Sequence, residues 1–205
     1  MRKVVVSEFV SLDGVMEGPG GDNGFVRGPW TVPYWGDDIG AFKAEELFAA
    51  DAMLLGRTTY EGFSEAWPER TGDDFGDHIN AVPKYVVSTT LTPEQATWGP
   101  VEILSGDLTA EIEARTARDG KDILVAGSCT LVHSLIAAGL VDELRLAVYP
   151  VVLGTGLKLF GDSDRRDFEL VSTTTSASGV QLVTLRKTDA PEAVAFDYEA
   201  MREKG

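Results

Sequence analysis

The sequence is poor in the residues that disulfides and metal centres need. It holds one cysteine, Cys129, and two histidines, His78 and His133, among 205 residues. A single thiol cannot form an internal disulfide, and a zinc site of several cysteines is excluded. Cys129 and His133 are four residues apart and could share a helix face, but two ligands do not complete a metal site. We expect no metal, and we interpret both residues as packing or surface residues.

Long apolar runs are also absent. No segment approaches the roughly 18 consecutive apolar residues that a membrane helix requires. The apolar run at the N-terminus meets Ser7 and Glu8 too early for a signal peptide. The hydrophobic fraction of 43% is that of an ordinary globular chain, which predicts folding without disulfides. We expect a cytoplasmic protein with one domain over residues 1–188 and an acidic tail or docking helix over 189–205.

Cationic residues are scarce relative to acidic ones. Lysine and arginine total 18 against 33 aspartate and glutamate residues, a net charge of −15. A field of this sign repels nucleic acid and anionic membranes, so we expect neither as a partner. If the chain binds a phosphorylated cofactor, main-chain amides and a few local cations must overcome the net charge.

Common catalytic signatures are missing as well. There is no Gly-x-Gly-x-x-Gly between a strand and a helix, no Walker loop, no His-Glu-x-x-His and no Gly-x-Ser-x-Gly. What the chain does have is a regular alternation of strand-like and helix-like segments, ending in two strands joined by a short turn. This order predicts an α/β fold, a three-layer α/β/α sandwich whose mixed sheet is mainly parallel with an antiparallel C-terminal hairpin.

The expected strands are short, apolar and rich in β-branched residues; they cover residues 3–9, 52–55, 84–88, 101–104, 122–126, 143–149, 168–174 and 180–187. A helix should begin near Asp37 or Asp38, either of which could cap it, and another should span 108–118. The glycine-rich stretch 18–24 must be a loop, and residues 69–77 read as an irregular acidic segment.

Three of the expected strands end in a similar way. Leu-Gly-Arg-Thr at 55–58, Val-Ser-Thr-Thr at 87–90 and Ala-Gly-Ser at 126–128 each follow a strand, and the first and last open a helix. Ligands of open parallel sheets bind at the carboxyl ends of the strands, and free amides at helix N-termini attract anions. Arg57 adds a guanidinium suited to phosphate. The three ends together predict a nucleotide-binding edge.

The same residues carry a family resemblance. Residues 55–61, Leu-Gly-Arg-Thr-Thr-Tyr-Glu, resemble the Met-Gly-Arg-x-Thr-Trp/Tyr-Glu segment of dihydrofolate reductases. Ser-Leu-Asp-Gly at 11–14, the stretch 80–88, Gly-Ser at 127–128 and the stretch 141–160 fit as well. Together, over residues 2–187, they resemble the dihydrofolate reductase-like family that includes the C-terminal reductase domain of the bifunctional deaminase-reductase of bacterial riboflavin biosynthesis.

The resemblance implies a dihydrofolate reductase-like fold and NADPH as hydride donor. Carried over by position, it implies a cofactor-binding set consisting of Ser11, Asp13, Gly14, Gly56, Arg57, Thr58, Thr59, Ser88, Thr89, Gly127, Ser128, Leu131 and Val132. One departure stands out: the family often has Gly-Gly where this chain has Gly127-Ser128, so a side chain lies beside the expected cofactor.

The resemblance also implies a catalytic acid and a substrate-binding region. Asp38 aligns with the carboxylate that binds the pterin in dihydrofolate reductases, although a helix N-cap alone would explain an aspartate there. Trp30, Tyr34 and Trp35 could stack on a flat substrate ring or could pack the preceding loop against the domain. The loop over residues 15–35 would then be the lid over the site.

These observations lead to a hypothesis and an alternative. The hypothesis is an NADPH-dependent reductase that acts on a small heterocyclic substrate, either a ribosylaminopyrimidine of the riboflavin type or a dihydropterin. The alternative is a non-catalytic nucleotide- or ligand-binding protein on the same fold. The apolar segments 143–150 and 151–160 are compatible with a homodimer, as in many family members, and equally with core burial.

Overall fold

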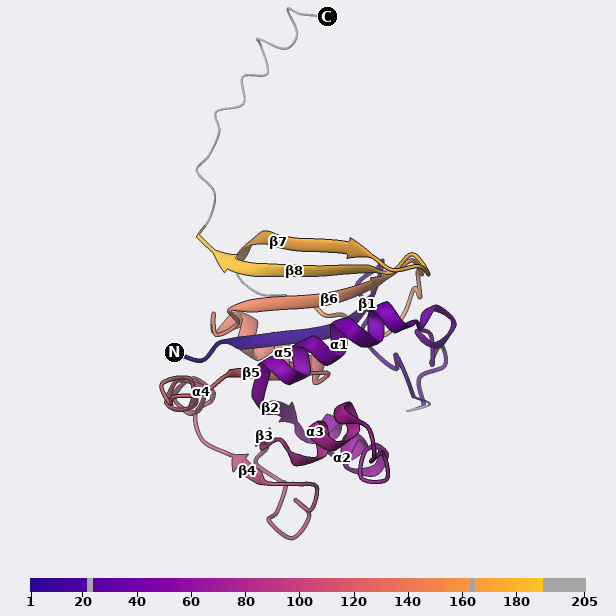
Figure 1. Cartoon of the computed structure of the whole chain (residues 1–205). Coiled ribbons are helices and arrows are strands. Elements are labelled where there is room, and N and C mark those ends of the chain that lie inside the picture. The colour runs from indigo at the N-terminus through magenta and orange to yellow at the C-terminus, as the bar shows by residue number, and fades with distance from the viewer. Residues whose placement is uncertain (22–23, 163–164, 190–205) are drawn as a thin grey trace, which may run out of the picture.

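The computed structural model describes residues 1–21, 24–162 and 165–189 of the chain (Figure 1). Eight strands form one sheet in the order β4-β3-β2-β5-β1-β6-β8-β7. The strands from β4 to β6 are parallel, whereas β8 is antiparallel to both β6 and β7. The predicted mixed sheet with its antiparallel hairpin is confirmed. The tail predicted for 189–205 lies outside the described residues after Asp189.

The elements agree closely with the expected order. The strands are β1 Val4–Ser11, β2 Ala50–Gly56, β3 Lys84–Val87, β4 Val101–Leu104, β5 Asp122–Ala126, β6 Glu143–Tyr149, β7 Asp167–Thr175 and β8 Gln181–Thr188. The helices are η1 Val32–Tyr34 (a 3₁₀ turn), α1 Asp37–Ala49, α2 Arg57–Ala66, α3 Asp74–Ala81, α4 Leu108–Thr116 and α5 Cys129–Ala137.

Helices cover both faces of the sheet, which confirms the three layers. In β1, Val4 and Val6 pack in a cluster with residues of α4 and α5, whereas Val5 packs with residues of α1, α2 and α3 on the other face. Figure 1 shows α1 lying across the face opposite α5. The alternation of side chains along a strand explains why a continuous valine run suits this central position.

Two local expectations were wrong. Neither Asp37 nor Asp38 caps α1, because the helix already includes both, and its N-cap is Gly36 without a side-chain hydrogen bond. Part of the stretch expected to be irregular belongs to α3, which is capped by the Asp73 carboxylate through a 2.9 Å bond from the Gly76 amide. This cap lies inside an acidic segment, so the capping signal was hidden by its charged neighbours.

No helix within the described ranges is both long and apolar enough to cross a lipid bilayer. Residues 151–160, expected either in a dimer contact or in the core, include both exposed and buried side chains. Val152, Leu157 and Phe160 are exposed, whereas Leu153 and Leu159 are buried. The homodimer stays a prediction.

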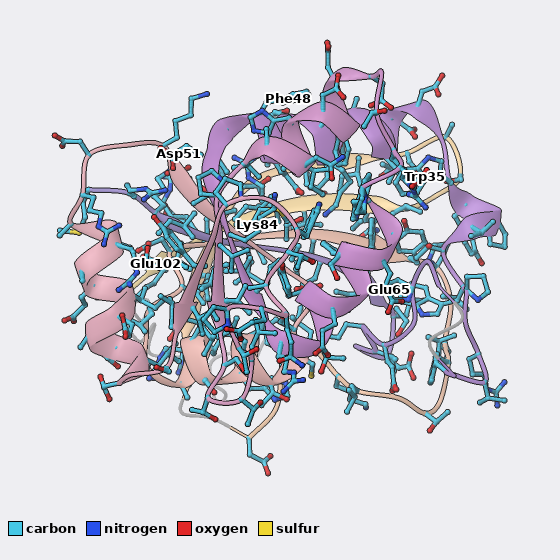
Figure 2. The ribbon with its side chains drawn as sticks, turned by 90° about the horizontal axis from the view of Figure 1, so that it is seen from below. Trp35, Phe48, Asp51, Glu65, Lys84 and Glu102 are labelled. Carbon is cyan, nitrogen blue, oxygen red and sulfur yellow. The ribbon has the colours of Figure 1, made fainter. Side chains whose placement is uncertain are left out.

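Lys84 is a buried cation at the start of β3. Its side chain is fully buried, and Figure 2 shows it well inside the outline of the molecule. The ammonium donates a 2.7 Å hydrogen bond to the Asn80 carbonyl and lies 4.1 Å from the centre of the Trp98 ring. Burial lowers the pKa of Lys84 from its usual 10.5 to about 8, because the charged form loses water.

We predict that the free energy of unfolding rises as pH increases from about 8 to 10.5. Within this window the unfolded chain keeps the Lys84 proton that the folded protein has lost, so folding is favoured by deprotonation. Urea denaturation at several pH values should show the rise in the native protein and in Lys158→Met, which changes an exposed lysine. Lys84→Met should lack it, and an undiminished rise in that variant would contradict the assignment.

Candidate functional site

Helices α2 and α5 begin side by side at the carboxyl edge of the sheet. Gly56 is the N-cap of α2 and Ser128 the N-cap of α5, and the Gly56 amide donates a 2.8 Å hydrogen bond to the Ser128 hydroxyl oxygen. A Cβ atom on Gly127 would lie 3.0 Å from the Thr59 methyl carbon. The strand ends expected to converge at 56–59 and 127–128 therefore do so.

These two helices lack the side-chain caps that α3 and α4 have, and α1 lacks one as well. The Asp107 carboxylate accepts a 3.0 Å bond from the Ala110 amide of α4, much as Asp73 caps α3. The N-caps of α2 and α5 make no such bond. The amides in the first turn of a helix have no partner within the helix. Two such sets of amides at one edge form a ready site for an anion.

Arg57 connects this pair of helix ends to the third strand end. Its guanidinium donates 2.7 Å hydrogen bonds to the Glu61 carboxylate and to the Thr90 hydroxyl. The Ser88 hydroxyl accepts from the Thr90 amide at 3.1 Å and orders the turn after β3. The side chain of Arg57 is about one-third exposed, so its pair with Glu61 orients the guanidinium rather than adding much stability. Thr58 and Thr89 are exposed nearby in sequence.

The turn at Gly127-Ser128 has an unusual backbone. Both residues are left-handed, with φ of 61° and 67°, and Ser128 is the one non-glycine residue with positive φ among those described. A side chain in this region costs about 1–2 kcal/mol. The Ser128 hydroxyl offsets part of that cost by accepting from Gly56. The departure from Gly-Gly therefore has a physical role, because the side chain joins the two helix ends.

The predicted cofactor residues at the end of β1 and just after it connect two loops. The Asp13 carboxylate accepts hydrogen bonds from the Ser11 hydroxyl at 2.7 Å and from the amides of Leu153 and Gly154 at 3.0 and 2.8 Å. These bonds lower the pKa of Asp13 to about 2, the hydroxyl contributing most. Gly14 provides the left-handed residue of the turn, with φ of 84°. Ser11 and Asp13 thus have structural partners of their own.

Leu131 and Val132, also predicted to contact the cofactor, lie in the hydrophobic core. Leu131 is 6% exposed and Val132 is fully buried, and both belong to the cluster between α5 and the sheet. The Val132 amide bonds to the Ser128 carbonyl at 2.9 Å. The structure therefore does not bring the Val132 side chain to the surface edge where the other predicted residues gather.

Asp38 lies in the first turn of α1 and is exposed. One carboxylate oxygen accepts a 2.7 Å bond from the Ala177 amide in the turn between β7 and β8, and the other accepts from the Ile39 amide at 2.9 Å. The carboxylate thus links α1 to the hairpin. Its proposed catalytic role stays a prediction.

The three predicted aromatic residues divide into two roles. Trp30 is buried, donates its indole hydrogen to the Glu17 carbonyl at 2.7 Å and packs edge-on against Tyr149 with 5.3 Å between ring centres. Tyr34 packs on the same ring at 5.7 Å. Trp35 is 54% exposed and packs edge-on against the Phe9 ring. Figure 2 shows Trp35 and Asp51, which lies near the start of β2, at opposite sides of the molecule.

A group of buried polar residues on β1 and α1 was missed by the sequence analysis. On one face of β1, Ser7 donates to the Glu46 carboxylate, and the Lys43 ammonium lies 3.0 Å from the same carboxylate and 4.6 Å from the Phe9 ring centre. On the other face, Glu8 is 4% exposed. The signal was present, because Ser7 and Glu8 interrupt an otherwise apolar central strand.

Burial raises the pKa of Glu8 well above its usual value of 4.5. Three smaller effects act on this pKa: the Lys43 charge lowers it, the Glu46 charge adds to the increase, and the nearby Gly127 amide lowers it. The edge therefore combines anion-binding amides, one guanidinium and a carboxyl group that favours its protonated form.

Comparison with known proteins identifies the family. The model of the RibD C-terminal domain matches residues 2–182. The uncharacterized protein YyaP of Bacillus subtilis strain 168 is 30% identical over 186 residues, which covers 87% of this chain and 92% of that protein. The match confirms the resemblance drawn from the strand-end motifs.

Solved structures of low sequence identity share the fold. RibD of Acinetobacter baumannii has a TM-score of 0.63 at 16% identity, covering 92% of this chain and 58% of that one. Dihydrofolate reductase of Enterococcus faecalis, solved as a complex with NADP(H), has a TM-score of 0.61 at 19% identity, covering 91% and 97% of the two chains.

We predict that Ser128→Ala destabilises the protein more than Ser128→Gly. Alanine keeps the left-handed strain and loses the oxygen that accepts from Gly56, whereas glycine loses the bond but relieves the strain. The difference should be about 1 kcal/mol in the free energy of unfolding, measured by urea denaturation. An alanine variant as stable as the glycine variant would show that the backbone here is not strained.

Proposed function

Because the chain belongs to the RibD C-terminal domain family, we propose that it is an NADPH-dependent reductase that transfers a hydride to a small heterocyclic substrate. The substrate class that we propose is a ribosylaminopyrimidine of the riboflavin type, with a dihydropterin as the second choice. The observation that carries the proposal is the joining of the α2 and α5 N-termini through Gly56 and Ser128, with Arg57 alongside.

The residues at this edge fit the phosphates of a dinucleotide. The first-turn amides after Gly56 and Ser128 suit the pyrophosphate, because both helix ends are left without side-chain caps. Arg57 suits a 2′-phosphate, since its guanidinium is already oriented by Glu61 and Thr90. Thr58, Thr59, Ser88 and Thr89 add hydroxyl groups along the same path. These contacts are local, so they can act despite the net charge of −15.

When bound, NADPH supplies the hydride, and the chain supplies position and exclusion of water. The loop that follows β1 is tied to the segment after β6 by the Asp13 carboxylate and by a 2.9 Å bond from the Leu157 amide to the Glu17 carboxylate. Trp30 anchors the loop, which leaves the exposed Trp35 as the ring available for stacking on a flat substrate.

A non-catalytic ligand-binding protein is the second candidate, and the hydrogen bonds made by Asp38 favour it. Both of its carboxylate oxygens accept main-chain hydrogen bonds, and the residue is exposed. A group in this position serves well as a link between α1 and the hairpin. Binding without turnover would support this second candidate.

We predict that Arg57→Ala weakens NADPH binding about 10- to 100-fold and changes NADH binding little. The guanidinium contacts the phosphate that only NADPH carries, and a charge-assisted pair of bonds is lost. Titration calorimetry with both cofactors would measure this selectivity. Arg118→Ala, which changes an exposed arginine near Glu102, is the matched control. If Arg57→Ala and the native protein bind NADPH with equal affinity, the proposed position of the cofactor is wrong.

We also predict substrate-dependent loss of NADPH absorbance with a ribosylaminouracil phosphate or with dihydrofolate. If Asp38 carries the substrate proton, Asp38→Asn should lower kcat at least tenfold while the NADPH dissociation constant is unchanged. Asp37→Asn, which changes the adjacent exposed carboxylate, is the control. Tight NADPH binding with no turnover of either substrate would favour the non-catalytic candidate.

A further inference from the structure

Glu8 lies where β1 loses a neighbouring strand. Pairing between β1 and β5 ends at Ser7 and Ala126, whereas pairing between β1 and β6 continues to Ser11 and Tyr149. The second half of β1, beginning with Glu8, therefore has no strand on its β5 side. The chain leaves β5 at this point through the left-handed Gly127 and enters α5.

The Glu8 side chain points to the α5 face. Val6 and Val10, two residues to either side, belong to the cluster that contains Leu131 and Val132 of α5. Side chains at i and i+2 of a strand share a face, so Glu8 emerges beside the start of α5. The Gly127 amide at the start of the turn into α5 is near enough to lower the pKa of this carboxyl group. The side chain thus borders the proposed cofactor edge.

One oxygen of this carboxyl is unsatisfied. Glu8 is 4% exposed, and its Oε1 atom has no hydrogen-bond partner among the described residues. A buried polar atom without a partner costs free energy, so such atoms are rare and often functional. A ligand group seated against this oxygen would supply the partner that it lacks.

The charged and titratable groups around Glu8 come from two helices. The charges of Lys43 and Glu46 on α1 lower and raise the pKa of Glu8, respectively. At the start of α5, burial and then the charges of Glu8 and Glu17 raise the pKa of the Cys129 thiol. The neighbouring β6 residue in register is Leu146, which carries no charge. Burial outweighs the attraction of Lys43, so the environment favours the neutral carboxyl. A neutral carboxyl donates one hydrogen bond through its O–H.

We propose that Glu8 is a specificity-determining residue whose unpartnered oxygen forms a hydrogen bond with a carbonyl on the heteroaromatic ring bound beyond the end of β5. This inference rests on the proposed function and deepens it. Two ring carbonyls share the required chemistry: the carboxamide of the nicotinamide and a carbonyl of a pyrimidine substrate. An ionised carboxylate would repel either oxygen, so ring binding weakens as pH rises.

The experiment compares ligands with and without each ring. Dissociation constants are measured by calorimetry from about pH 5 to pH 9 for NADPH, for 2′-phospho-ADP-ribose, which lacks the nicotinamide, and for a ribosylaminouracil phosphate in the presence of NADP⁺. The proteins are the native chain, Glu8→Gln, Glu8→Ala and Glu143→Gln. Glu143 is also a buried glutamate on the sheet, but it pairs with Lys3 and Arg145 at the opposite edge.

We expect the native protein and Glu143→Gln to lose ring-ligand affinity about tenfold as Glu8 ionises, relative to 2′-phospho-ADP-ribose, which corrects for the phosphates. Glu8→Gln should flatten this profile, because its amide donates at every pH. Glu8→Ala should bind the ring ligand about tenfold more weakly at low pH. Thermal melting checks folding, and the flattened profile of the isosteric glutamine variant decides the matter if the alanine variant does not fold.

The outcomes are distinguishable. A Glu8-dependent profile for NADPH alone assigns the nicotinamide carbonyl, and one for the pyrimidine alone assigns the substrate carbonyl; either supports the proposal. An unchanged profile in Glu8→Gln, or equal losses for 2′-phospho-ADP-ribose, overturns it while leaving the proposed function intact. A native protein that binds neither NADPH nor 2′-phospho-ADP-ribose overturns both.

Discussion

The hydrogen bond from the Gly56 amide to the Ser128 hydroxyl is the interaction on which the candidate site depends. It joins the N-terminal ends of α2 and α5, which follow two adjacent parallel strands, β2 and β5. The sheet alone would place both helix ends at one edge. The bond fixes their separation, and it uses the hydroxyl that would otherwise cap α5. The first turn of α5 therefore has no side-chain cap, and the same contact offsets part of the backbone strain at Ser128.

The second organising feature is the contrast between the whole molecule and the site. The chain is strongly acidic, yet three acidic side chains near the edge are either paired with a cation or disfavoured from ionising. Glu61 is paired with Arg57 and Glu46 with Lys43, and burial favours the neutral form of Glu8. The edge is therefore less negative than the composition indicates. Local neutralisation of this kind allows an acidic protein to accept an anionic ligand.

Much of the fold could be predicted from the sequence, because its signals are local. Valine runs, glycine breaks and the hairpin turn predicted the strands and their succession along the chain, and residues 101–104 form a strand as expected. The convergence of Gly56, Ser88 and Gly127 also followed, since parallel strands end at a common edge. The third helix was missed because its capping aspartate lies in an acidic stretch, where one carboxylate resembles its neighbours.

The sequence could not reveal contacts between segments that lie far apart in the chain. Asp13 was expected beside the cofactor, but its partners are amides near residue 153, and only the folded chain brings them together. Asp38 was weighed as an acid or a cap, and its main contact is a hairpin turn at residue 177. Glu8 was passed over because its significance lies in where β5 ends, a property of strand register rather than of any motif.

The connection at Asp13 has a consequence for how the protein responds to its surroundings. The hydrogen bonds to Asp13, that from the Ser11 hydroxyl most of all, lower its pKa to about 2, so the carboxylate stays ionised near neutral pH and ties the loop after β1 to the segment after β6. The Asp13 carboxylate therefore holds the two loops together and does not act as a pH sensor near neutral pH. Acid-base behaviour of the neighbouring edge near neutral pH is then expected from other groups, such as Glu8.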